Sequence, residues 1–262
     1  MRLRPAFIRR QVMGRLYRRP ALLGDRGPIV SFTFDDFPRT ASTVGGPILE
    51  ALGVRGTYYA AAGLMNSANE LGEQFRPEDV RSLVERGHEV GSHTFGHISC
   101  NAVCSAEFQE DVNRGQDALA EISGIQSANF AYPFGDVTWE VKKQLGPTLA
   151  SSRGTFPGFN GPEIDLNLLK ANSLCGDEKN LRRAENLITD NARRKSWLIF
   201  FTHDVQPKPS PWGCTPELLQ STAKFAIRSG SRVLTIQDAL AEVGVAVADT
   251  KRSACLGVSE LH

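Results

Sequence analysis

The sequence has almost no net charge and no long hydrophobic run. Its 30 lysine and arginine residues nearly balance its 29 aspartate and glutamate residues, which leaves a formal net charge of +1. Such a balance creates no global field that would attract a polyanion. Outside the N-terminus the chain shows no basic patch with stacking groups, so we expect no nucleic-acid partner. No stretch approaches the roughly 18–20 consecutive apolar residues that a membrane-spanning helix requires.

Cysteine is scarce and odd in number. Five cysteines argue against a complete disulfide framework and mildly favour a reducing compartment. Cys100 and Cys104 have a spacing that metal ligands use, but no second cysteine pair completes such a site. A secretion signal is also missing, because Arg9-Arg10 interrupts the apolar stretch that such a signal needs. We therefore expect a cytoplasmic protein.

Arginine is concentrated in residues 1–28, which we interpret as a basic N-terminal arm. Its arginines include Arg2, Arg4, Arg9, Arg10, Arg15, Arg18 and Arg19. Charge runs of this kind are typical of a solvated or disordered arm. The alternative is an amphipathic helix on an anionic membrane surface, which would place the protein at the inner face of a membrane. The apolar side of that helix would carry Ile8, Val12, Met13 and Leu16.

Beyond the arm, short β-rich runs alternate with helical patterns. The predicted strands are Ile29–Phe34, Gly56–Ala60, Glu89–Ser92, Asn129–Tyr132, Thr148–Ser152, Trp197–Thr202 and Arg232–Thr235. Such alternation predicts an α/β fold with a mostly parallel sheet and helices outside it, and a single-domain barrel is ordinary at this length. We assign that domain to residues 29–243 and interpret residues 244–262 as a weakly ordered tail.

Polar residues mark the expected helix starts. Thr215 followed by Pro216 indicates a cap and a first helical residue, and Thr235 with Asp238 resembles a capping box. Ser105 is the expected cap of another helix. The apolar positions of that helix keep helical spacing at Phe108, Val112, Leu119 and Ile122.

Two adjacent aspartates, Asp35 and Asp36, follow the first predicted strand. Functional groups of a parallel barrel lie at the carboxyl ends of its strands. Neighbouring side chains on an extended chain point opposite ways, so one carboxylate can bind a metal ion while the other accepts a proton from water. Taken alone, the pair also fits an exposed acidic turn or a helix N-cap.

Histidines follow two other predicted strands. His93 and His97 share one face if their segment is helical, and two imidazoles with a carboxylate can hold a divalent metal ion. Thr94 stands where metalloproteases of the H-E-x-x-H type carry glutamate, so the motif itself supplies no general base. His203 follows the apolar run Trp197–Thr202, a position that suits proton transfer near neutral pH. The alternatives are two surface histidines and a hydrogen-bonded structural histidine.

In combination, these segments resemble the motifs of polysaccharide deacetylases with a NodB homology domain, also called carbohydrate esterase family 4. The first motif is Thr33–Asp36 (T-F-D-D), and the second is His93–His97 (H-T-F-G-H). The third is represented by Phe130–Gly135 and the fifth by Ile199–His203. The resemblance covers residues 29–240, with the motifs in the family's order.

The resemblance implies a distorted (β/α) barrel of the NodB type and an N-acetylated carbohydrate substrate. The implied reaction is metal-dependent removal of an N-acetyl group from an amino sugar in a polysaccharide, oligosaccharide or glycoconjugate. By the family pattern, Asp36, His93 and His97 bind one divalent ion, with zinc expected first and cobalt or nickel as alternatives. Asp35 is then the catalytic base.

By the same resemblance, the Phe134 backbone N–H helps to stabilise the oxyanion, and His203 protonates the departing amine. The sequence departs from the family pattern in two motifs. Ala131 occupies the place where the third motif often carries an arginine that orients the base, and Arg153 is a candidate replacement. The fourth motif, which usually supplies an aspartate and a tryptophan near the catalytic histidine, is not recognisable. Candidates for that aspartate are Asp165 and Asp204.

Two further functions stay open on the same fold. One is hydrolysis of another small amide or imide, and the other is non-catalytic binding of a carbohydrate or a partner. A binding module is expected to lose the base or a metal ligand, whereas this chain retains Asp35, Asp36, His93 and His97. The motifs leave the sugar, its chain length and the oligomeric state open.

Overall fold

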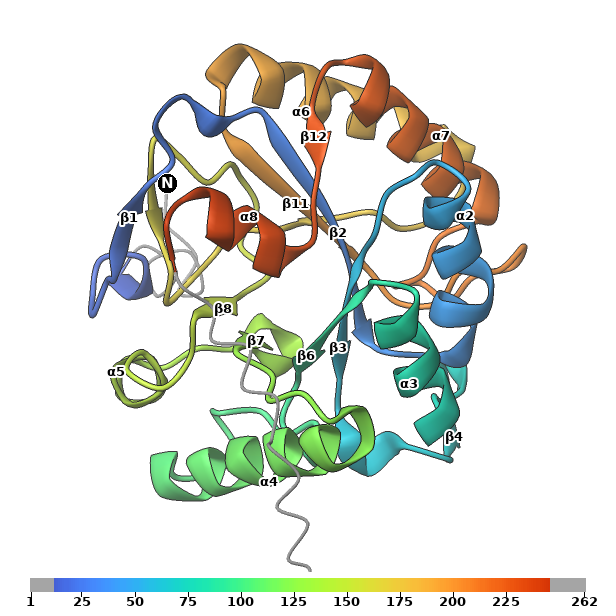
Figure 1. The fold of residues 1–262 in the computed structure, drawn as a ribbon. Coiled ribbons are helices and arrows are strands. Elements are labelled where there is room, and N and C mark those ends of the chain that lie inside the picture. Colours follow the sequence, from blue (N-terminus) through green and yellow to red (C-terminus); the bar gives the residue numbers. More distant parts are fainter. Residues whose placement is uncertain (1–11, 246–262) are drawn as a thin grey trace, which may run out of the picture.

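A curled, eight-stranded sheet forms the centre of the structure, a computed structural model that describes residues 12–245 (Figure 1). The strand order is β10-β11-β2-β3-β6-β7-β8, and β12 pairs with the first part of β2. The bounds are β2 (Ile29–Asp36), β3 (Thr57–Ala60), β6 (Glu89–Ser92), β7 (Asn129–Ala131), β8 (Ser151–Arg153), β10 (Asn172–Ser173), β11 (Trp197–Thr202) and β12 (Arg232–Val233). Every pair in this sheet is parallel. The expected α/β fold, a distorted barrel in one domain, is confirmed.

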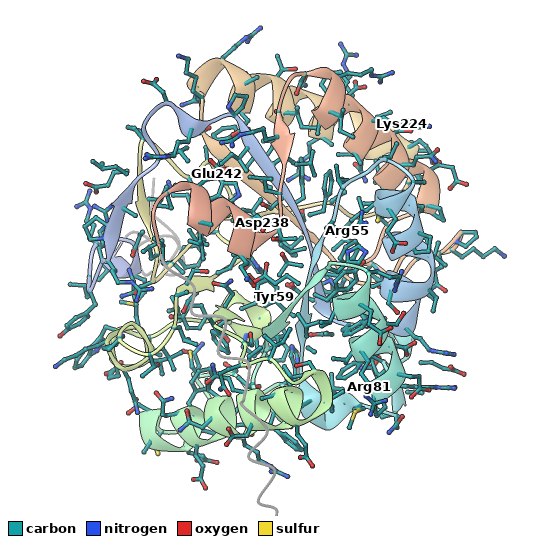
Figure 2. The ribbon with its side chains drawn as sticks, viewed as in Figure 1. Arg55, Tyr59, Arg81, Lys224, Asp238 and Glu242 are labelled. Carbon is teal, nitrogen blue, oxygen red and sulfur yellow. The ribbon has the colours of Figure 1, made fainter. Side chains whose placement is uncertain are left out.

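Helices connect the strands, and those other than α8 pack outside the sheet, as Figure 1 shows. They are α2 (Gly46–Glu50), α3 (Pro77–Glu85), α4 (Ser105–Ser123), α5 (Trp139–Leu145), α6 (Leu181–Arg194), α7 (Pro216–Arg228) and α8 (Ile236–Glu242). Short 3-10 or π turns are η1 (Gly24–Arg26), η2 (Ala41–Gly45), η3 (Ala62–Leu64), η4 (Pro133–Gly135) and η5 (Glu178–Asn180). In Figure 2, Arg81 and Lys224 lie on peripheral helices, whereas Tyr59 lies among the strands.

Helix α8 lies across the ends where the central strands begin. The Ile236 N–H at its start donates to Thr57 Oγ1 at 3.0 Å, and the Gln237 N–H donates to Glu89 Oε2 at 2.9 Å. Thr57 begins β3 and Glu89 begins β6. The helix therefore closes the amino-terminal end of the barrel, and the carboxyl ends of the strands are at the opposite end.

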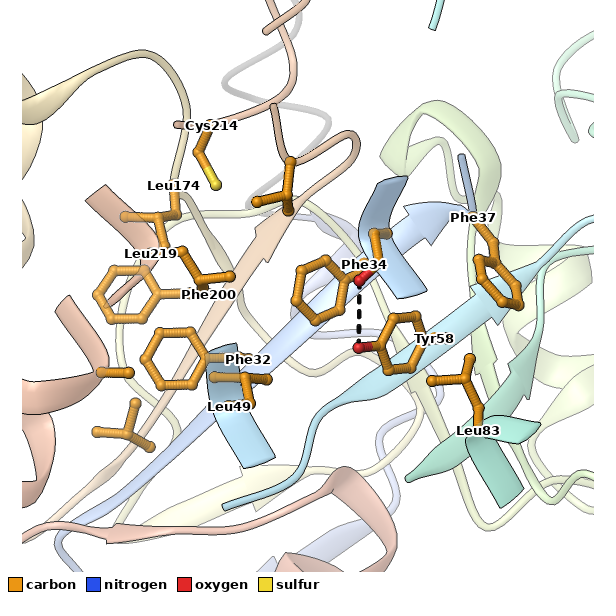
Figure 3. Packing of buried hydrophobic residues seen from close by; sticks show 14 of the residues in the cluster. Phe32, Phe34, Phe37, Leu49, Tyr58, Leu83, Leu174, Phe200, Cys214 and Leu219 are labelled. Carbon is orange, nitrogen blue, oxygen red and sulfur yellow. Dashed lines mark hydrogen bonds between the residues drawn. The ribbon is translucent and has the colours of Figure 1, made fainter. Parts of the chain in front are cut away.

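Side-chain alternation along β2 separates two apolar cores. Phe32 and Phe34 lie in the outer core beneath the helices, and Ile29 lies in the inner core of the barrel. Figure 3 shows the outer core, where the Phe34 and Tyr58 rings stack with centroids 4.6 Å apart. The Tyr58 hydroxyl donates to the Ala41 carbonyl at 3.4 Å. The side chain that follows Phe34 consequently points into the barrel.

The described part of the predicted arm packs against the domain. Strand β1 (Pro20–Leu22) pairs antiparallel with β9 (Glu163–Asp165), and Leu23 is fully buried. The Arg19 guanidinium donates to three carbonyls near the end of α5, including Leu149 O at 2.7 Å. These contacts join residues 19–23 to the barrel, while the boundary at residue 28 stays a prediction.

Other predictions for the termini lie partly outside the described residues. Ile8 of the predicted amphipathic helix and residues 246–262 of the predicted tail both fall outside them. Of the remaining helix positions, Met13 is buried, and Val12 and Leu16 are exposed. Within residues 12–245, no helix is both long and apolar enough to cross a membrane.

The seven predicted strands are all present, with some ends shifted. The last one ends at Val233 rather than Thr235, because Thr235 Oγ1 accepts the Asp238 N–H at 3.1 Å and caps α8. The short pair β4 (Ala68–Asn69) and β5 (Gly72–Glu73) was not predicted. A two-residue strand carries too little periodicity to be recognised in a sequence.

Of the expected helix caps, one was placed wrongly. Thr215 Oγ1 accepts the Leu218 N–H at 3.2 Å and caps α7 as predicted. Ser105, however, is the first residue of α4 and not its cap. The N-cap is Cys104, which has an extended backbone and makes no side-chain capping hydrogen bond. The prediction for Ser105 was therefore one residue late.

Candidate metal centre and active site

The three residues expected to bind a metal ion meet at the carboxyl ends of β2 and β6. Asp36 Oδ1 lies 2.9 Å from His97 Nε2 and 3.3 Å from His93 Nε2. One ligand atom from each residue lies within 4.8 Å of the other two. Asp36 and His93 are buried and His97 is partly exposed, so an ion can reach the group from the His97 side.

Left-handed backbone conformations bring the two histidines together. The segment after β6 is not helical, so the explanation of the spacing by one helical face is wrong. Instead, φ is 65° at Thr94 and 52° at His97, and it is also positive at Asp36 (61°) and Phe37 (67°). Non-glycine residues in this region carry strain of about 1–3 kcal/mol each and cluster at functional sites.

The donor atoms of this group fit a cation. His93 Nδ1 lies 2.7 Å from the Ala131 carbonyl, which can only accept, so Nδ1 carries a proton and Nε2 is the ring atom left for other partners. That Nε2 lies 3.3 Å from Asp36 Oδ1, a buried oxygen with no hydrogen-bond partner among the described residues. A cation between these atoms would be held by both side chains. Two imidazoles and a carboxylate suit zinc, cobalt or nickel.

The charge state of Asp36 is also that of a ligand. Burial alone would raise the pKa of this carboxyl group, because the charged form loses solvation. The neighbouring His93 and His97 side chains outweigh burial and hold the pKa well below its ordinary range. Asp36 is therefore a carboxylate across the physiological range.

Asp35 points into the barrel, where its partner is Arg153. The Arg153 guanidinium is fully buried and forms an ion pair with Asp35 Oδ1. It also lies over the rings of Tyr59 and Phe201, 5.0 and 5.5 Å from their centroids. In the sheet, Arg153 of β8 pairs in register with Ala131 of β7. The Arg153 guanidinium thus comes from the strand next to β7, at the same height in the sheet as the arginine that the third motif lacks.

Phe134 combines an unusual backbone conformation with a ring that packs on the candidate metal ligand His97. It has φ 60° and ψ 3° inside η4, a left-handed conformation that reorients its peptide group. Among the described residues, no backbone hydrogen bond uses the Phe134 N–H. The phenyl ring is exposed and lies 4.6 Å from the His97 ring centroid. This N–H is therefore available to an oxygen of a bound molecule.

His203 completes the group, but its partners differ from those expected. Its Nε2 lies 4.0 Å from Asp36 Oδ2, and its Nδ1 lies 3.3 Å from the Trp212 carbonyl. Asp165 instead binds the buried Lys142 ammonium at 2.6 Å. Asp204 is the next residue on the chain and turns away into its own loop. Both expected carboxylate partners of His203 are therefore wrong.

These side chains surround a cavity of about 240 Å³. Its wall also includes residues that the sequence did not single out: Glu70, Leu71, Tyr132, Thr155, Phe201 and Trp212. Trp212 lies within a Gly/Pro-rich segment, and a tryptophan in such a loop was a signal that could have found it; Tyr132 and Phe201 lie inside the third and fifth motifs. Two larger cavities, of about 450 and 300 Å³, contain none of the six predicted catalytic and metal-binding residues, although Asp165 lines the larger one.

Comparison with known proteins gives matches over the first part of the domain. Residues 24–149 match the family model described as polysaccharide deacetylase. A peptidoglycan-N-acetylmuramic acid deacetylase, PdaC of Bacillus subtilis, is 27% identical over 117 residues, which cover 45% of this chain and 24% of that protein. A chitin deacetylase of Colletotrichum lindemuthianum is 30% identical over 116 residues, covering 44% of this chain and 45% of that protein. The chain thus spans less than half the length of these curated relatives.

The solved structures extend the likeness in fold to most of the chain. The structure of the chitin deacetylase from Colletotrichum lindemuthianum superposes with a TM-score of 0.57 at 21% identity. The superposition covers 80% of this chain and 86% of that chain. Just under half of the chain thus matches the polysaccharide deacetylase family model, and the solved structure shows that most of the chain shares the fold of such a deacetylase.

Proposed function

We propose that this protein is a divalent-metal-dependent hydrolase that removes an N-acetyl group from an amino sugar in a polysaccharide, oligosaccharide or glycoconjugate. The observation that carries this proposal is the convergence of Asp36, His93 and His97 beside a second, arginine-bound carboxylate, Asp35. The names of the relatives, which are peptidoglycan and chitin deacetylases, support the same reaction class. A family match alone would leave the reaction open, because folds host many chemistries.

In this proposal, Asp36, His93 and His97 hold the cation. When bound, the cation supplies Lewis-acid polarisation of the acetyl carbonyl and makes a nearby water molecule more acidic. Asp35 accepts the proton of the attacking water as general base. Its Oδ1 is held by Arg153, which fixes the carboxylate in the barrel and leaves Oδ2 to face the water. Fixing the base in this way avoids reorganisation during the reaction.

Two further groups act on the other atoms of the acetamide. The free Phe134 N–H donates to the carbonyl oxygen as that oxygen gains negative charge. His203 gives a proton to the sugar nitrogen while the C–N bond breaks, because an amine anion is too poor a leaving group to depart alone. The products are acetate and a free amino sugar. His203 lies on the side of Asp36 Oδ2, away from the carboxylate oxygen that faces the other two histidines.

The decisive experiment separates the two adjacent aspartates. The purified chain is assayed for bound metal and for acetate release from short N-acetylglucosamine oligomers, as parent, Asp35→Asn and Asp36→Asn. Asp35→Asn should keep the metal and lose about 10²–10⁴ in rate, because the amide cannot accept a proton. Asp36→Asn should lower metal content. Loss of metal in Asp35→Asn alone would reverse the two roles, and an inactive, fully metal-loaded parent would contradict the deacetylase proposal for this substrate class.

A further inference from the structure

The loop that follows His203, residues 204–214, is built around one buried carboxylate. Asp204 is fully buried, and its Oδ2 accepts Gln206 Nε2 at 2.8 Å and the Ser210 N–H at 2.9 Å. Its Oδ1 accepts the Ser210 hydroxyl proton. The backbone also closes at the base of the loop, where the Cys214 N–H donates to Asp204 O at 2.9 Å. A single side chain thus sets the path of the loop.

Ser210 transmits this constraint to Trp212. Its Oγ, which donates to Asp204, accepts the N–H groups of Trp212 at 3.2 Å and Gly213 at 3.1 Å. Gly213 lies so close to Asp204 that an added Cβ would be 2.2 Å from Asp204 Oδ1. The peptide between Trp212 and Gly213 is therefore held directly against the carboxylate.

That peptide carries the carbonyl that faces the candidate proton donor. The Trp212 carbonyl lies 3.3 Å from His203 Nδ1, and it also accepts from Cys175 Sγ at 3.0 Å and from Thr202 Oγ1 at 3.4 Å. A carbonyl only accepts, so it holds a proton on His203 Nδ1 and leaves Nε2 as the atom that takes up and gives the transferred proton. Nε2 then faces Asp36 Oδ2 and the cavity.

Trp212 is also one of the residues that line the cavity. Trp212 is 58% exposed and Phe134 is 64% exposed, and both line the cavity. Large exposed aromatic rings beside a binding cavity offer an apolar surface with a polar edge, which suits contact with a sugar ring. The Phe134 ring packs on His97 and the Trp212 carbonyl faces His203, so the two residues lie on the His97 side and the His203 side of the site.

We propose that Asp204 is a positioning residue, which acts through Ser210 to place the backbone carbonyl and the indole ring of Trp212. The Trp212 carbonyl orients His203 in place of the aspartate that the fourth motif lacks, and the Trp212 indole holds the sugar ring next to the acetamide. This inference rests on the proposed deacetylase function. A neutral carbonyl replaces a carboxylate as the partner of the proton donor, so the loop fixes the orientation of the ring without adding a charge.

The first test compares Ser210→Ala with Lys208→Ala, a matched control in the same loop whose side chain is exposed. Ser210→Ala removes the link from Asp204 to Trp212 and lets the carbonyl move. We expect kcat to fall about 10–100-fold with KM nearly unchanged, because a misplacement of about 1 Å can cost that much. The ¹⁵N chemical shifts of the His203 ring should show a loss of the Nδ1–H tautomer, and Lys208→Ala should show neither change.

The second test separates the ring of Trp212 from its carbonyl. Trp212→Ala removes the indole and keeps the peptide, so KM for an N-acetylglucosamine oligomer should rise about 5–10-fold, the range of one aromatic contact. Its kcat and the His203 tautomer should stay close to those of the parent. Trp212→Phe should restore most of the loss in KM.

Two results would overturn the inference. One is a Ser210→Ala protein with the same kcat and the same His203 ring shifts as Lys208→Ala. The other is a Trp212→Ala protein with unchanged KM. A parent that fails to release acetate would instead contradict the proposed function, and the ring shifts, which need no substrate, would still decide whether Asp204 orients His203.

Discussion

Two buried carboxylates at opposite ends of the barrel have the same exposure and opposite surroundings. Glu89, where β6 begins, and Asp36, where β2 ends, are each 8% exposed. Glu89 accepts from Thr57 Oγ1 at 2.8 Å, from Asn129 Nδ2 at 2.6 Å and from the Gln237 N–H. Asp36 Oδ1 faces two imidazole nitrogens and has no hydrogen-bond partner among the described residues. Burial by itself therefore does not separate a structural carboxylate from a ligand; its partners do.

The two ends also differ in backbone conformation. Within residues 12–245, eight non-glycine residues have positive φ. Five of them lie at the candidate site: Asp36, Phe37, Thr94, His97 and Phe134. At the amino-terminal end, the start of α8 is capped by Thr235, and Glu89 is hydrogen-bonded to three donors. Strained backbone and unpaired polar groups at the carboxyl-terminal end indicate that this end is functional. Hydrogen-bonded polar groups at the amino-terminal end indicate that their role is to stabilise the fold.

The largest expected effect is at the metal site. His93→Ala removes one of three ligands, so bound metal should fall to a small fraction of the parent's and the rate should drop by at least about 10³-fold, because the cation supplies several kcal/mol of stabilisation. Elemental analysis and steady-state assays measure the two quantities. A His93→Ala variant with full metal content and normal turnover would show that His93 is not a metal ligand. The difference between the surroundings of Asp36 and Glu89 would then carry no functional meaning.

Next in size is the ion pair inside the barrel. Arg153→Met leaves Asp35 as a buried, unpaired charge, so the free energy of unfolding should fall by about 3–5 kcal/mol. The double variant with Asp35→Asn should recover part of that loss, since no charge is then left unpaired. Urea unfolding of the parent, both single variants and the double variant gives the coupling. Simple additivity would show that Arg153 and Asp35 act independently.

A smaller effect is expected for Glu89, whose contribution to the free energy of unfolding should depend on pH. Burial raises the pKa of Glu89 despite the hydrogen bonds from Gln237, Asn129 and Thr57 that lower it. An acid whose pKa rises on folding binds its proton more firmly when folded, so its contribution to stability declines as pH rises between the ordinary and the raised pKa. Glu89→Gln removes this dependence. The variant should therefore lose about 1–3 kcal/mol below the ordinary glutamate pKa and less above the raised value.

Unfolding of parent and Glu89→Gln at both pH extremes measures that difference. A loss that grows as pH rises would mean that Glu89 is stabilised in its charged form. Glu89 would then resemble Asp36, and the contrast between the two ends would fail on electrostatic grounds.

The smallest effect concerns helix caps. Thr235→Ala removes the side-chain cap of α8 and should lower the free energy of unfolding by about 1 kcal/mol. Ser105→Ala, at a residue that is not the cap of α4, should stay within about 0.5 kcal/mol of the parent. Thermal unfolding compares the two, and both should keep the parental rate. A large loss of turnover in Thr235→Ala would couple the amino-terminal end to the site.

Much of the fold was predictable because its signals are local. Seven of the eight strands of the central sheet, and the caps Thr215 and Thr235, depend on residues close together in the chain. Asp36, His93 and His97 were placed together because parallel strands bring their carboxyl ends to one edge. Local pattern did mislead at Ser105, where either of two neighbours can begin the helix.

The partners of the site residues were less accessible to sequence reasoning. Arg153 contacts Asp35 across 118 positions of sequence, and only the strand order and register decide which strand supplies the cation. The partner of His203 is a backbone carbonyl. Because every residue has one, no pattern of side chains in the sequence could predict it. Asp165 was a reasonable candidate until the fold placed Lys142 beside it.

The register between Ala131 and Arg153 has a consequence for how related chains are sorted. A linear search pattern that demands arginine in the third motif would discard this chain as a degenerate copy. In three dimensions, positions 131 and 153 are neighbours on the adjacent strands β7 and β8. We infer that an arginine at either position can reach Asp35. Exchanging the two residues, as Ala131→Arg with Arg153→Ala, asks whether the barrel tolerates the charge in either slot. Functional diagnosis in this fold is then better framed by position in the sheet than by position in the chain.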